Sequence, residues 1–174
     1  MPLYALPTPS LLLDKDILER NLRRMQDRAN GLKVRLRPHL KTHKCLEVAR
    51  WQERLGAQGV TVSTFYEAQQ FAAAGFNDIF WAFPLPPVYA TRVAELAGKI
   101  TLRVVVDSLD AKGHLDKAAR VAGHQIHVWL KVDCGYHRAG VDPQSGLAEE
   151  LVRKLNESKV LSFDGILSHS GHAY

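Results

Sequence analysis

The sequence predicts an α/β fold in which helices cover a parallel β-sheet. Short apolar segments alternate with amphipathic segments of helical period about six times along the 174 residues. Several of the apolar segments are continuous, which is typical of strands that are buried on both faces. Of the residues, 46% are hydrophobic and 24% are charged, a composition typical of a globular domain. A repeated strand and helix unit predicts a parallel sheet, because each helix carries the chain back to start the next strand.

The first two units are expected in the N-terminal third of the chain. A leucine run at 11–13 predicts a strand, and apolar residues at helical spacing predict a helix over 14–30. Residues 34–37 are predicted to be extended, because Pro38 disfavours helical geometry in the residue before it. A second helix is predicted over about 43–55.

The later units follow the same pattern and carry clear signals for helix starts. Thr64 followed by Glu67 predicts a capping box, and Ser108 is a typical N-cap residue. The predicted strands are 60–62, 78–83, 102–106, 127–132 and 161–167. The predicted helices are 64–75, 89–98, 108–122 and 146–155.

Two architectures fit this alternation. A doubly wound sheet is complete at this length, whereas a (β/α)8 barrel usually needs about 250 residues and would here lack its last two units. Periodicity alone does not distinguish them. In both architectures the functional groups lie just past the carboxyl ends of the strands.

The charge balance favours a small anionic ligand over nucleic acid. Lysine and arginine number 23 and aspartate and glutamate 18, which gives a formal net charge of +5. Such a surface attracts phosphate or carboxylate groups. The basic residues are spread along the chain without an arginine-rich run, a zinc knuckle or an RNA-binding signature, so we expect no nucleic-acid partner.

The cysteine content and the apolar runs are typical of a cytoplasmic protein. The two cysteines, Cys45 and Cys134, form no CxxC pair and are too few for a disulfide framework. The first residues lack the basic region and apolar core of a signal peptide, and no apolar run approaches the ~20 residues of a membrane span. We therefore expect a cytoplasmic location and no membrane partner.

The segment 37–44 carries the first candidate chemistry. It contains one arginine, two histidines and two lysines around Pro38. Crowded like charges favour the neutral form of an amine. A neutral amine can form a Schiff base with a carbonyl substrate or with pyridoxal phosphate, whose phosphate the neighbouring cations attract. A solvated basic loop is the alternative explanation of the same residues.

Two pairs of histidines make a divalent metal site a further alternative explanation of these segments. His39 with His43, or His169 with His172, has the residue type that ligates a divalent ion. Neither pair has an H-E-x-x-H or comparable spacing, so the sequence favours a site without metal in this chain.

Two later strand ends carry further candidates. Residues 133–138 end in Arg138, and residues 168–174 include His169 and Tyr174. Taken singly, each has a structural explanation: residues 133–138 are also typical of a tight turn, His169 of a core histidine, and Tyr174 of a packed chain end. Their recurrence at strand ends, where one ligand would meet all of them, favours a shared site.

Two long motifs are specific enough to indicate a family: R-P-H-x-K-T-H-K at 37–44 and D-C-G-Y-H-R-x-G at 133–140. Supporting segments lie at 8–14, 62–68 and 165–174. In this order they resemble the fold-type III pyridoxal-phosphate enzymes related to alanine racemase. The nearest resemblance is to the D-serine dehydratase and D-threonine aldolase branch, and it extends over essentially the whole chain.

The resemblance implies a (β/α)8 TIM-type barrel of the alanine racemase N-terminal kind, here incomplete with about six βα units. It implies that residues 1–174 are the N-terminal part of a pyridoxal-phosphate-binding barrel. The last barrel units and a C-terminal β domain would then lie outside this chain. In the lyases of this branch that domain holds a divalent metal, zinc or manganese, and a homodimer is expected.

The resemblance also implies roles for individual residues. Lys41 matches the Schiff-base lysine, and Lys44 is a lower-ranked rival. Arg138 matches an arginine beside the ring oxygen of the cofactor, His169 a histidine beside its pyridine ring, and Tyr174 an aromatic residue at the cofactor. Lys41 is therefore the expected catalytic residue, and all four matched residues are expected to bind pyridoxal 5'-phosphate.

The activity that the resemblance implies is that of a lyase acting on a small D-β-hydroxy amino acid. Dehydration and deamination of D-serine or D-threo-3-hydroxyaspartate is favoured over aldol cleavage of D-threonine, because segments 62–64 and 171–174 resemble the dehydratases. Two alternatives stay open. One is a non-catalytic pyridoxal-phosphate carrier, since a single-domain relative has the same barrel. The other is a fragment that is inactive alone because its sheet edges are open.

Overall fold

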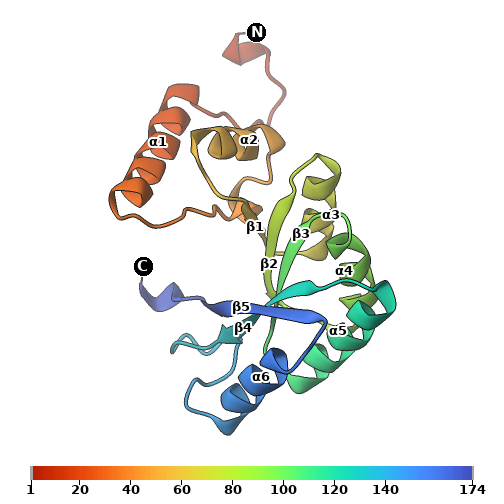
Figure 1. Ribbon diagram of the computed structural model, residues 1–174. Coiled ribbons are helices and arrows are strands. Elements are labelled where there is room, and N and C mark those ends of the chain that lie inside the picture. The colour runs from red at the N-terminus through yellow and green to blue at the C-terminus, as the bar shows by residue number, and fades with distance from the viewer. Residues whose placement is uncertain (1, 174) are drawn as a thin grey trace.

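A computed structural model of the chain shows a five-stranded parallel sheet with helices packed along it (Figure 1). The structure describes residues 2–173. The strands are β1 (Val60–Val62), β2 (Asp78–Pro84), β3 (Thr101–Val106), β4 (Ile126–Val132) and β5 (Leu161–Ser168). The α-helices are α1 (Lys15–Gly31), α2 (Leu46–Leu55), α3 (Phe65–Ala73), α4 (Ala90–Ala97), α5 (Leu109–Ala122) and α6 (Gly146–Asn156). Short 3-10 helices are η1 (Leu3–Ala5), η2 (Leu40–Thr42), η3 (Pro87–Tyr89) and η4 (Gly171–Ala173).

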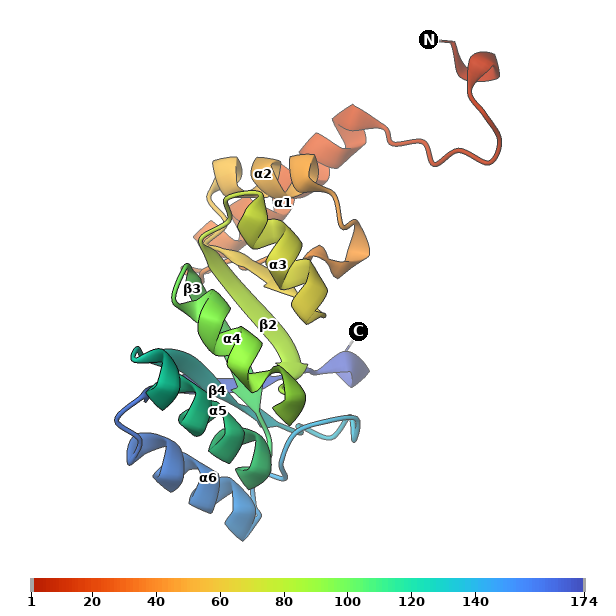
Figure 2. The same cartoon turned by 90° about the vertical axis from the view of Figure 1, so that its right-hand side faces the viewer.

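The strands lie side by side in their sequence order, from β1 to β5. In a doubly wound sheet the strand order reverses at a switch point and helices cover both faces. Here α3, α4, α5 and α6 lie on one face of the sheet, as Figure 2 shows. The sheet is therefore part of a barrel wall, which confirms the barrel prediction. Within residues 2–173 the barrel is partial and not closed.

Side chains alternate between the two faces of the sheet along β4. Ile126, Val128 and Leu130 are at most 1% exposed and belong to the core under the helices. The intervening residues His127 and Trp129 lie on the opposite, concave face, because successive side chains of a strand point in opposite directions. The apolar set therefore fixes which residues line the inside of the barrel wall.

The main hydrophobic core lies between the sheet and the helix layer. On α5, Leu115 and Ala119 are fully buried, in the same cluster as Val104 of β3 and Ile126 of β4. They recur at helical spacing, so they form one apolar face. Burial of each such leucine contributes about 2 kcal/mol relative to exposure. This packing fixes α5 against the middle of the sheet.

The starts of α3 and α5 are set by side-chain caps. Thr64 Oγ1 accepts a hydrogen bond from the N–H of Glu67, and the Glu67 carboxylate accepts one from the N–H of Thr64. The predicted capping box is thus confirmed. Ser108 accepts from the N–H of Ala111, which confirms the predicted cap of α5. A cap of this kind contributes about 1 kcal/mol.

The predicted strand at 11–13 is wrong. No strand pairs with this segment within residues 2–173, and Leu11 is 100% exposed. In Figure 2 the N-terminal arm that contains it extends away from the sheet. A strand needs a neighbouring backbone for its hydrogen bonds, and a run of leucines does not supply one.

The predicted extended segment at 34–37 is present but only loosely paired. It leads to one isolated parallel bridge between His39 and Thr61 of β1. Its backbone also receives a hydrogen bond of 2.8 Å from the N–H of Gln58 to the carbonyl of Leu36. The chain therefore runs alongside β1 without forming a full strand.

The helix predicted over 43–55 begins only at Leu46. Lys44 has a φ of +51°, in the left-handed region, and this conformation interrupts a right-handed helix. The other predicted strands and helices are present with small shifts at their ends. None of the helices in the described part of the chain is long and apolar enough to cross a membrane.

We expect Leu115→Ala to lower the free energy of unfolding by about 2–5 kcal/mol, because it leaves a cavity between α5 and the sheet. The matched control is Val121→Ala on the same helix, where the side chain is 90% exposed. The control should change stability by no more than about 0.5 kcal/mol. Urea unfolding followed by circular dichroism measures both variants, and equal effects would contradict the placement of Leu115 in the core.

Candidate active site

A cavity of about 210 Å³ lies at the carboxyl ends of the strands. Its lining includes Lys41, Lys131, Arg138 and His169, together with the ends of β1, β2 and β5. None of the described residues that line it is an aspartate or a glutamate. A concave site with this charge attracts anions.

Lys41 is held at this cavity by its buried neighbour Leu40. Leu40 is 1% exposed and packs in the main core, so it anchors η2 from the inside. The backbone N–H of Lys41 donates to Nδ1 of His39 over 3.4 Å. With Leu40 turned into the core, the side chain of Lys41 lines the cavity.

His39 adopts a neutral form with a defined tautomer. Its Nδ1 accepts from Lys41, and its Nε2 lies 3.4 Å from Oγ of Ser63. The pKa of His39 is lowered to about 4, mainly because burial disfavours the charged ring. The charge of Lys41 lowers this pKa further, Glu67 opposes the shift and His169 adds to it. A neutral ring that accepts at Nδ1 carries its proton on Nε2, from which it can donate to Ser63.

Lys44 is engaged in an ion pair away from the cavity. Its Nζ lies 3.1 Å from the carboxylate of Glu67, whose side chain is 8% exposed. The same carboxylate accepts from the N–H of Ser63 at 2.8 Å. Burial alone would raise the pKa of Glu67, but the hydrogen bonds from Ser63 and Lys44 outweigh it and the pKa is lowered. Among the two candidate lysines, the geometry therefore favours Lys41.

The loop that carries Arg138 is closed by hydrogen bonds to the end of β4. The N–H of Val141 donates to the carbonyl of Lys131, and the N–H of Asp133 donates to the carbonyl of Val141, both at 2.9 Å. Gly140 lies at a φ of +109°, and a Cβ there would be 2.7 Å from the backbone nitrogen of Asp133. The site thus requires glycine. The closed loop keeps Arg138 at the edge of the cavity.

Tyr136 lies between Arg138 and His169. The guanidinium carbon of Arg138 is 5.3 Å from the centre of the Tyr136 ring, and the His169 ring meets the same tyrosine edge-on at 5.4 Å. The pKa of this histidine is lowered, first by burial and then by the charges of Arg138, Lys131 and Lys41. The ring is therefore mainly neutral at neutral pH.

Lys131 contributes a second amine to the cavity. It is 4% exposed, and its side chain lies on the concave face of β4. The pKa of Lys131 is lowered, first by burial and then by Arg138.

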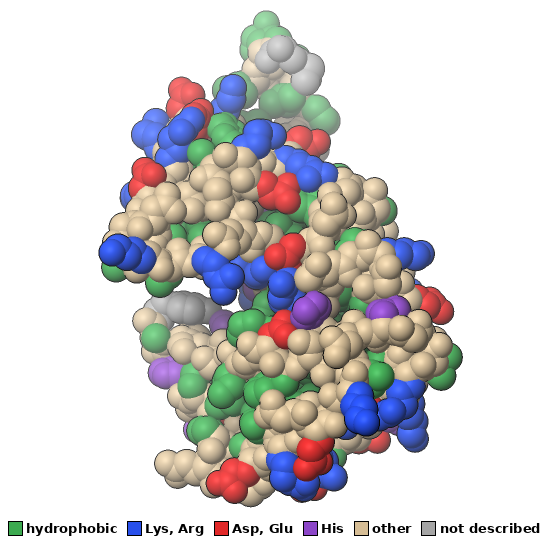
Figure 3. All heavy atoms as spheres, viewed as in Figure 1, with side chains coloured by type: hydrophobic (Ala, Val, Ile, Leu, Met, Phe, Trp, Pro, Cys, Tyr) green, Lys and Arg blue, Asp and Glu red, His purple; other side chains and the backbone are tan. Residues whose placement is uncertain are grey.

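An ion-pair network ties the lysine-bearing segment to the amino-terminal ends of the strands. Asp78 of β2 receives hydrogen bonds of 2.8 and 2.9 Å from Arg37 and also pairs with Arg103 of β3. His127 of β4 lies 2.8 Å from Asp164 of β5, and Nε of Arg103 is 4.0 Å from the same carboxylate. Figure 3 shows charged side chains of both signs across the middle of the molecule. This network fixes the wall of the cavity.

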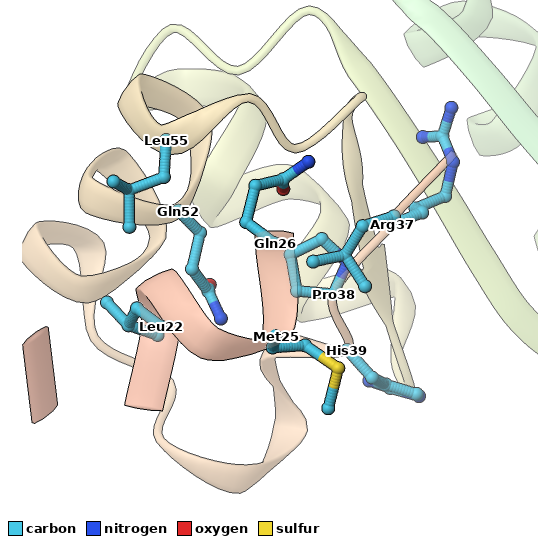
Figure 4. A pocket seen from close by; sticks show the side chains of 9 residues that line it. Leu22, Met25, Gln26, Arg37, Pro38, His39, Gln52 and Leu55 are labelled. Carbon is cyan, nitrogen blue, oxygen red and sulfur yellow. The ribbon is translucent and has the colours of Figure 1, made fainter. Parts of the chain in front are cut away.

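A second cavity of about 340 Å³ lies between α1, α2 and the segment before η2 (Figure 4). Leu22 and Met25 of α1 and Leu55 of α2 give it apolar walls. The Oε1 atoms of Gln26 and Gln52 have no hydrogen-bond partner among the described residues. No lysine lines this cavity in the described part of the chain, so it is not the candidate site for Schiff-base chemistry.

The structure brings three of the four predicted site residues to one cavity: Lys41, Arg138 and His169. The fourth, Tyr174, lies outside the described residues. These residues come from segments that are far apart in the sequence, as expected for residues that follow the carboxyl ends of neighbouring strands.

The sequence does not single out Lys131 and Tyr136, although both lie beside predicted site residues. For Lys131 a signal was available, because it continues the period-two series of His127 and Trp129 on the concave face. For Tyr136 the only signal was its place inside the D-C-G-Y-H-R motif.

The described residues provide no metal centre. Within residues 2–173 no three His, Cys, Asp or Glu side chains are grouped so that they could hold a metal ion. The ring nitrogens of His39 meet Lys41 and Ser63, and Nδ1 of His43 accepts from the N–H of Cys45 at 3.0 Å. The alternative of a histidine metal site therefore has no support in this part of the chain.

Comparisons with known proteins agree on one family. The family model described as alanine racemase, N-terminal domain, matches residues 13–174. A D-threo-3-hydroxyaspartate dehydratase from Delftia sp. (strain HT23) is 37% identical over 174 residues, covering 99% of this chain and 46% of that protein. Its solved structure has a TM-score of 0.92 and covers 98% of this chain and 45% of the other.

Two further relatives have related activities in their names. A D-serine dehydratase from Dictyostelium discoideum is 35% identical and covers 97% of this chain and 46% of that protein. The solved structure of a D-threonine aldolase from Filomicrobium marinum has a TM-score of 0.89 at 34% identity, covering 94% of this chain and 44% of that one. The chain thus spans less than half the length of these relatives.

We expect stability to fall as the pH is lowered from 6.5 toward 4, partly because of His39. Its pKa is lowered to about 4 in the folded state, so between these values the unfolded state binds the extra proton and acidification favours unfolding. Between these two pH values the free energy of unfolding of the His39→Gln variant should fall by about 1–2 kcal/mol less than that of the wild type. This figure allows for solvent screening of a partly buried ring.

Urea unfolding at pH 7, 5.5 and 4.5 measures the effect. His114→Gln serves as the control, because the His114 side chain is 52% exposed on α5. Identical pH dependence for the wild type and His39→Gln would contradict the neutral assignment of His39.

Proposed function

This chain belongs to the family of the alanine racemase N-terminal domain, and from that premise we propose that it forms the N-terminal part of the cofactor barrel of a pyridoxal-phosphate-dependent lyase. The proposed substrates are D-β-hydroxy amino acids. The observation that carries the proposal is a lysine amine, that of Lys41, lining a cavity with Lys131, Arg138 and two neutral histidines and no carboxylate among the described lining residues.

The residues present suit pyridoxal phosphate. The cofactor carries a phosphate and a ring oxygen that are negative at neutral pH. The cavity offers cations, and no acidic side chain competes for them among the described residues that line it. When bound, pyridoxal phosphate supplies an aldehyde that condenses with amines and a ring that stabilises negative charge on the substrate α carbon.

Each residue of the site has a proposed role. Lys41 would hold the cofactor through its amine and would take a proton from, or return one to, the α carbon of the substrate. Arg138 would stabilise the ring oxygen by its fixed positive charge. His169, in its neutral form, would contact the cofactor ring, and Tyr174 would add a further aromatic contact.

His39 and Glu67 position this machinery. His39 accepts from the backbone of Lys41, and Glu67 binds Lys44 and the end of β1. His39 and the Lys44–Glu67 ion pair are both held near the end of β1 by contacts with Ser63. Lys44 is therefore paired with a carboxylate, and the lysine of this loop that lines the cavity is Lys41.

The names of the relatives support a substrate class. They include a D-threo-3-hydroxyaspartate dehydratase, a D-serine dehydratase and a D-threonine aldolase. We favour dehydration, which converts D-serine to pyruvate and ammonia, over cleavage of D-threonine to glycine and acetaldehyde. A homodimer and a divalent metal, zinc or manganese, held by residues outside this chain are part of the same proposal. One solved structure of the first relative is described as a metal-free form.

Borohydride reduction of the intact protein loaded with pyridoxal phosphate, followed by peptide mapping, tests the central assignment. We expect the pyridoxyl tag on Lys41, and Lys41→Ala should abolish it and lower turnover by about 10²-fold or more. Lys44→Ala is the matched control, since Lys44 pairs with Glu67 and should leave the tag in place. A tag on another lysine would overturn the assignment.

The substrate is tested by assays for pyruvate and acetaldehyde with D-serine, D-threo-3-hydroxyaspartate and D-threonine. Their L-enantiomers are the controls. Tagging of Lys41 without turnover of any of these substrates would instead favour the non-catalytic carrier.

A further inference from the structure

We propose that Lys131 is an anion-binding residue of this site, where its ammonium group contacts an anionic oxygen of the cofactor or of the substrate carboxylate. The inference rests on the proposed function and adds a residue to which the sequence motifs assign no role. It is carried by the burial of Lys131, the lack of a partner for its amine among residues 2–173 and the charge of the surrounding cavity.

Lys131 is buried in a place where a lysine is unusual. It is the second-to-last residue of β4 and is 4% exposed, while the same side of the strand faces the cavity. Lysines are rarely buried to this extent, because the ammonium group loses its hydration. A buried ammonium group therefore needs a hydrogen-bond acceptor or an anion that replaces its lost hydration.

No residue between 2 and 173 forms a hydrogen bond or an ion pair with the amine of Lys131. The two carboxylates whose charges act on it are engaged elsewhere. Asp133 binds the backbone N–H and the ring Nδ1 of His137, both at 3.0 Å. Asp107 accepts from the N–H of Gly140 at 3.3 Å. These acids hold the loop that closes the site and leave the amine facing the cavity.

The surroundings of this amine are positive. Burial is the main factor that lowers the pKa of Lys131, and the like charge of Arg138 is the second, although Cys134, Asp107 and Asp133 act in the opposite direction. An anion in the cavity would offset both the loss of hydration and the repulsion. Charge-assisted hydrogen bonds of this kind are among the strongest that a protein forms.

An anionic oxygen of this kind can come from either of two molecules. One is the ring oxygen or phosphate of pyridoxal phosphate, and the other is the carboxylate of the amino acid. Calorimetry of the intact protein separates them. Pyridoxal phosphate is titrated into the cofactor-free protein, and malonate, a dicarboxylate without an amine, is titrated into the loaded protein.

We expect Lys131→Met to weaken one of these two binding events by about tenfold or more, and Lys131→Arg to retain most of the affinity. A lower affinity for pyridoxal phosphate assigns the contact to the cofactor. A lower affinity for malonate assigns it to the substrate carboxylate. The control is Lys154→Met on α6, where the lysine is 39% exposed and pairs with Glu150. If Lys131→Met binds both probes within twofold of wild type, the proposal is wrong.

Thermal unfolding distinguishes ligand binding from a structural role. An anion-binding Lys131 is an unpaired buried charge without ligand, so Lys131→Met should unfold at an equal or higher temperature than the ligand-free wild type. The rise in melting temperature caused by the bound probe should shrink in the same variant. A lower melting temperature with unchanged affinities would indicate a structural residue and overturn the proposal.

Borohydride tagging of Lys131→Met at saturating cofactor separates this proposal from the proposed function. If Lys41 is tagged while both affinities match wild type, Lys131 does not bind the anion and the proposed function stands. If Lys41 is not tagged even in the wild type while Lys131→Met loses affinity, the anion site stands and the proposed function fails.

Discussion

The alternation of side chains along the parallel strands determines both the hydrophobic core and the lining of the cavity. On β4, Ile126, Val128 and Leu130 must lie under the helices because they are apolar, so the residues between them face the inside of the barrel wall. A slip of one residue would bury charged groups in the core and expose the apolar set. The register that buries the core therefore also places Lys131 at the cavity.

The distribution of acidic residues follows from the same geometry. In the amino-terminal halves of the strands, Asp78 pairs with Arg37 and Arg103, and Asp164 contacts His127. At the carboxyl ends, Glu67 and Asp133 are used to hold loops through backbone hydrogen bonds. The cavity between these loops keeps its positive charge, because the nearby acids are already bound. Because none of the described lining residues is an aspartate or a glutamate, the cavity attracts anions.

Much of the fold was predictable because local signals agreed with the tertiary structure. The strands from β1 to β5 follow apolar runs, and the caps at Thr64 and Ser108 mark helix starts that the structure retains. The exception at 11–13 has a physical cause, since a strand exists only where another backbone accepts its hydrogen bonds. The late start of α2 has another cause, the left-handed backbone at Lys44, which a favourable helical sequence does not reveal.

Local periodicity was enough to predict the alternation of strands and helices. The order of residues in the two motifs was enough to identify the candidates Lys41, Arg138 and His169. The folded chain alone shows the strand order, the pairing of Lys44 with Glu67 and the burial of Lys131. Each depends on distances between segments that are remote in sequence, and such distances exist only once the chain has packed.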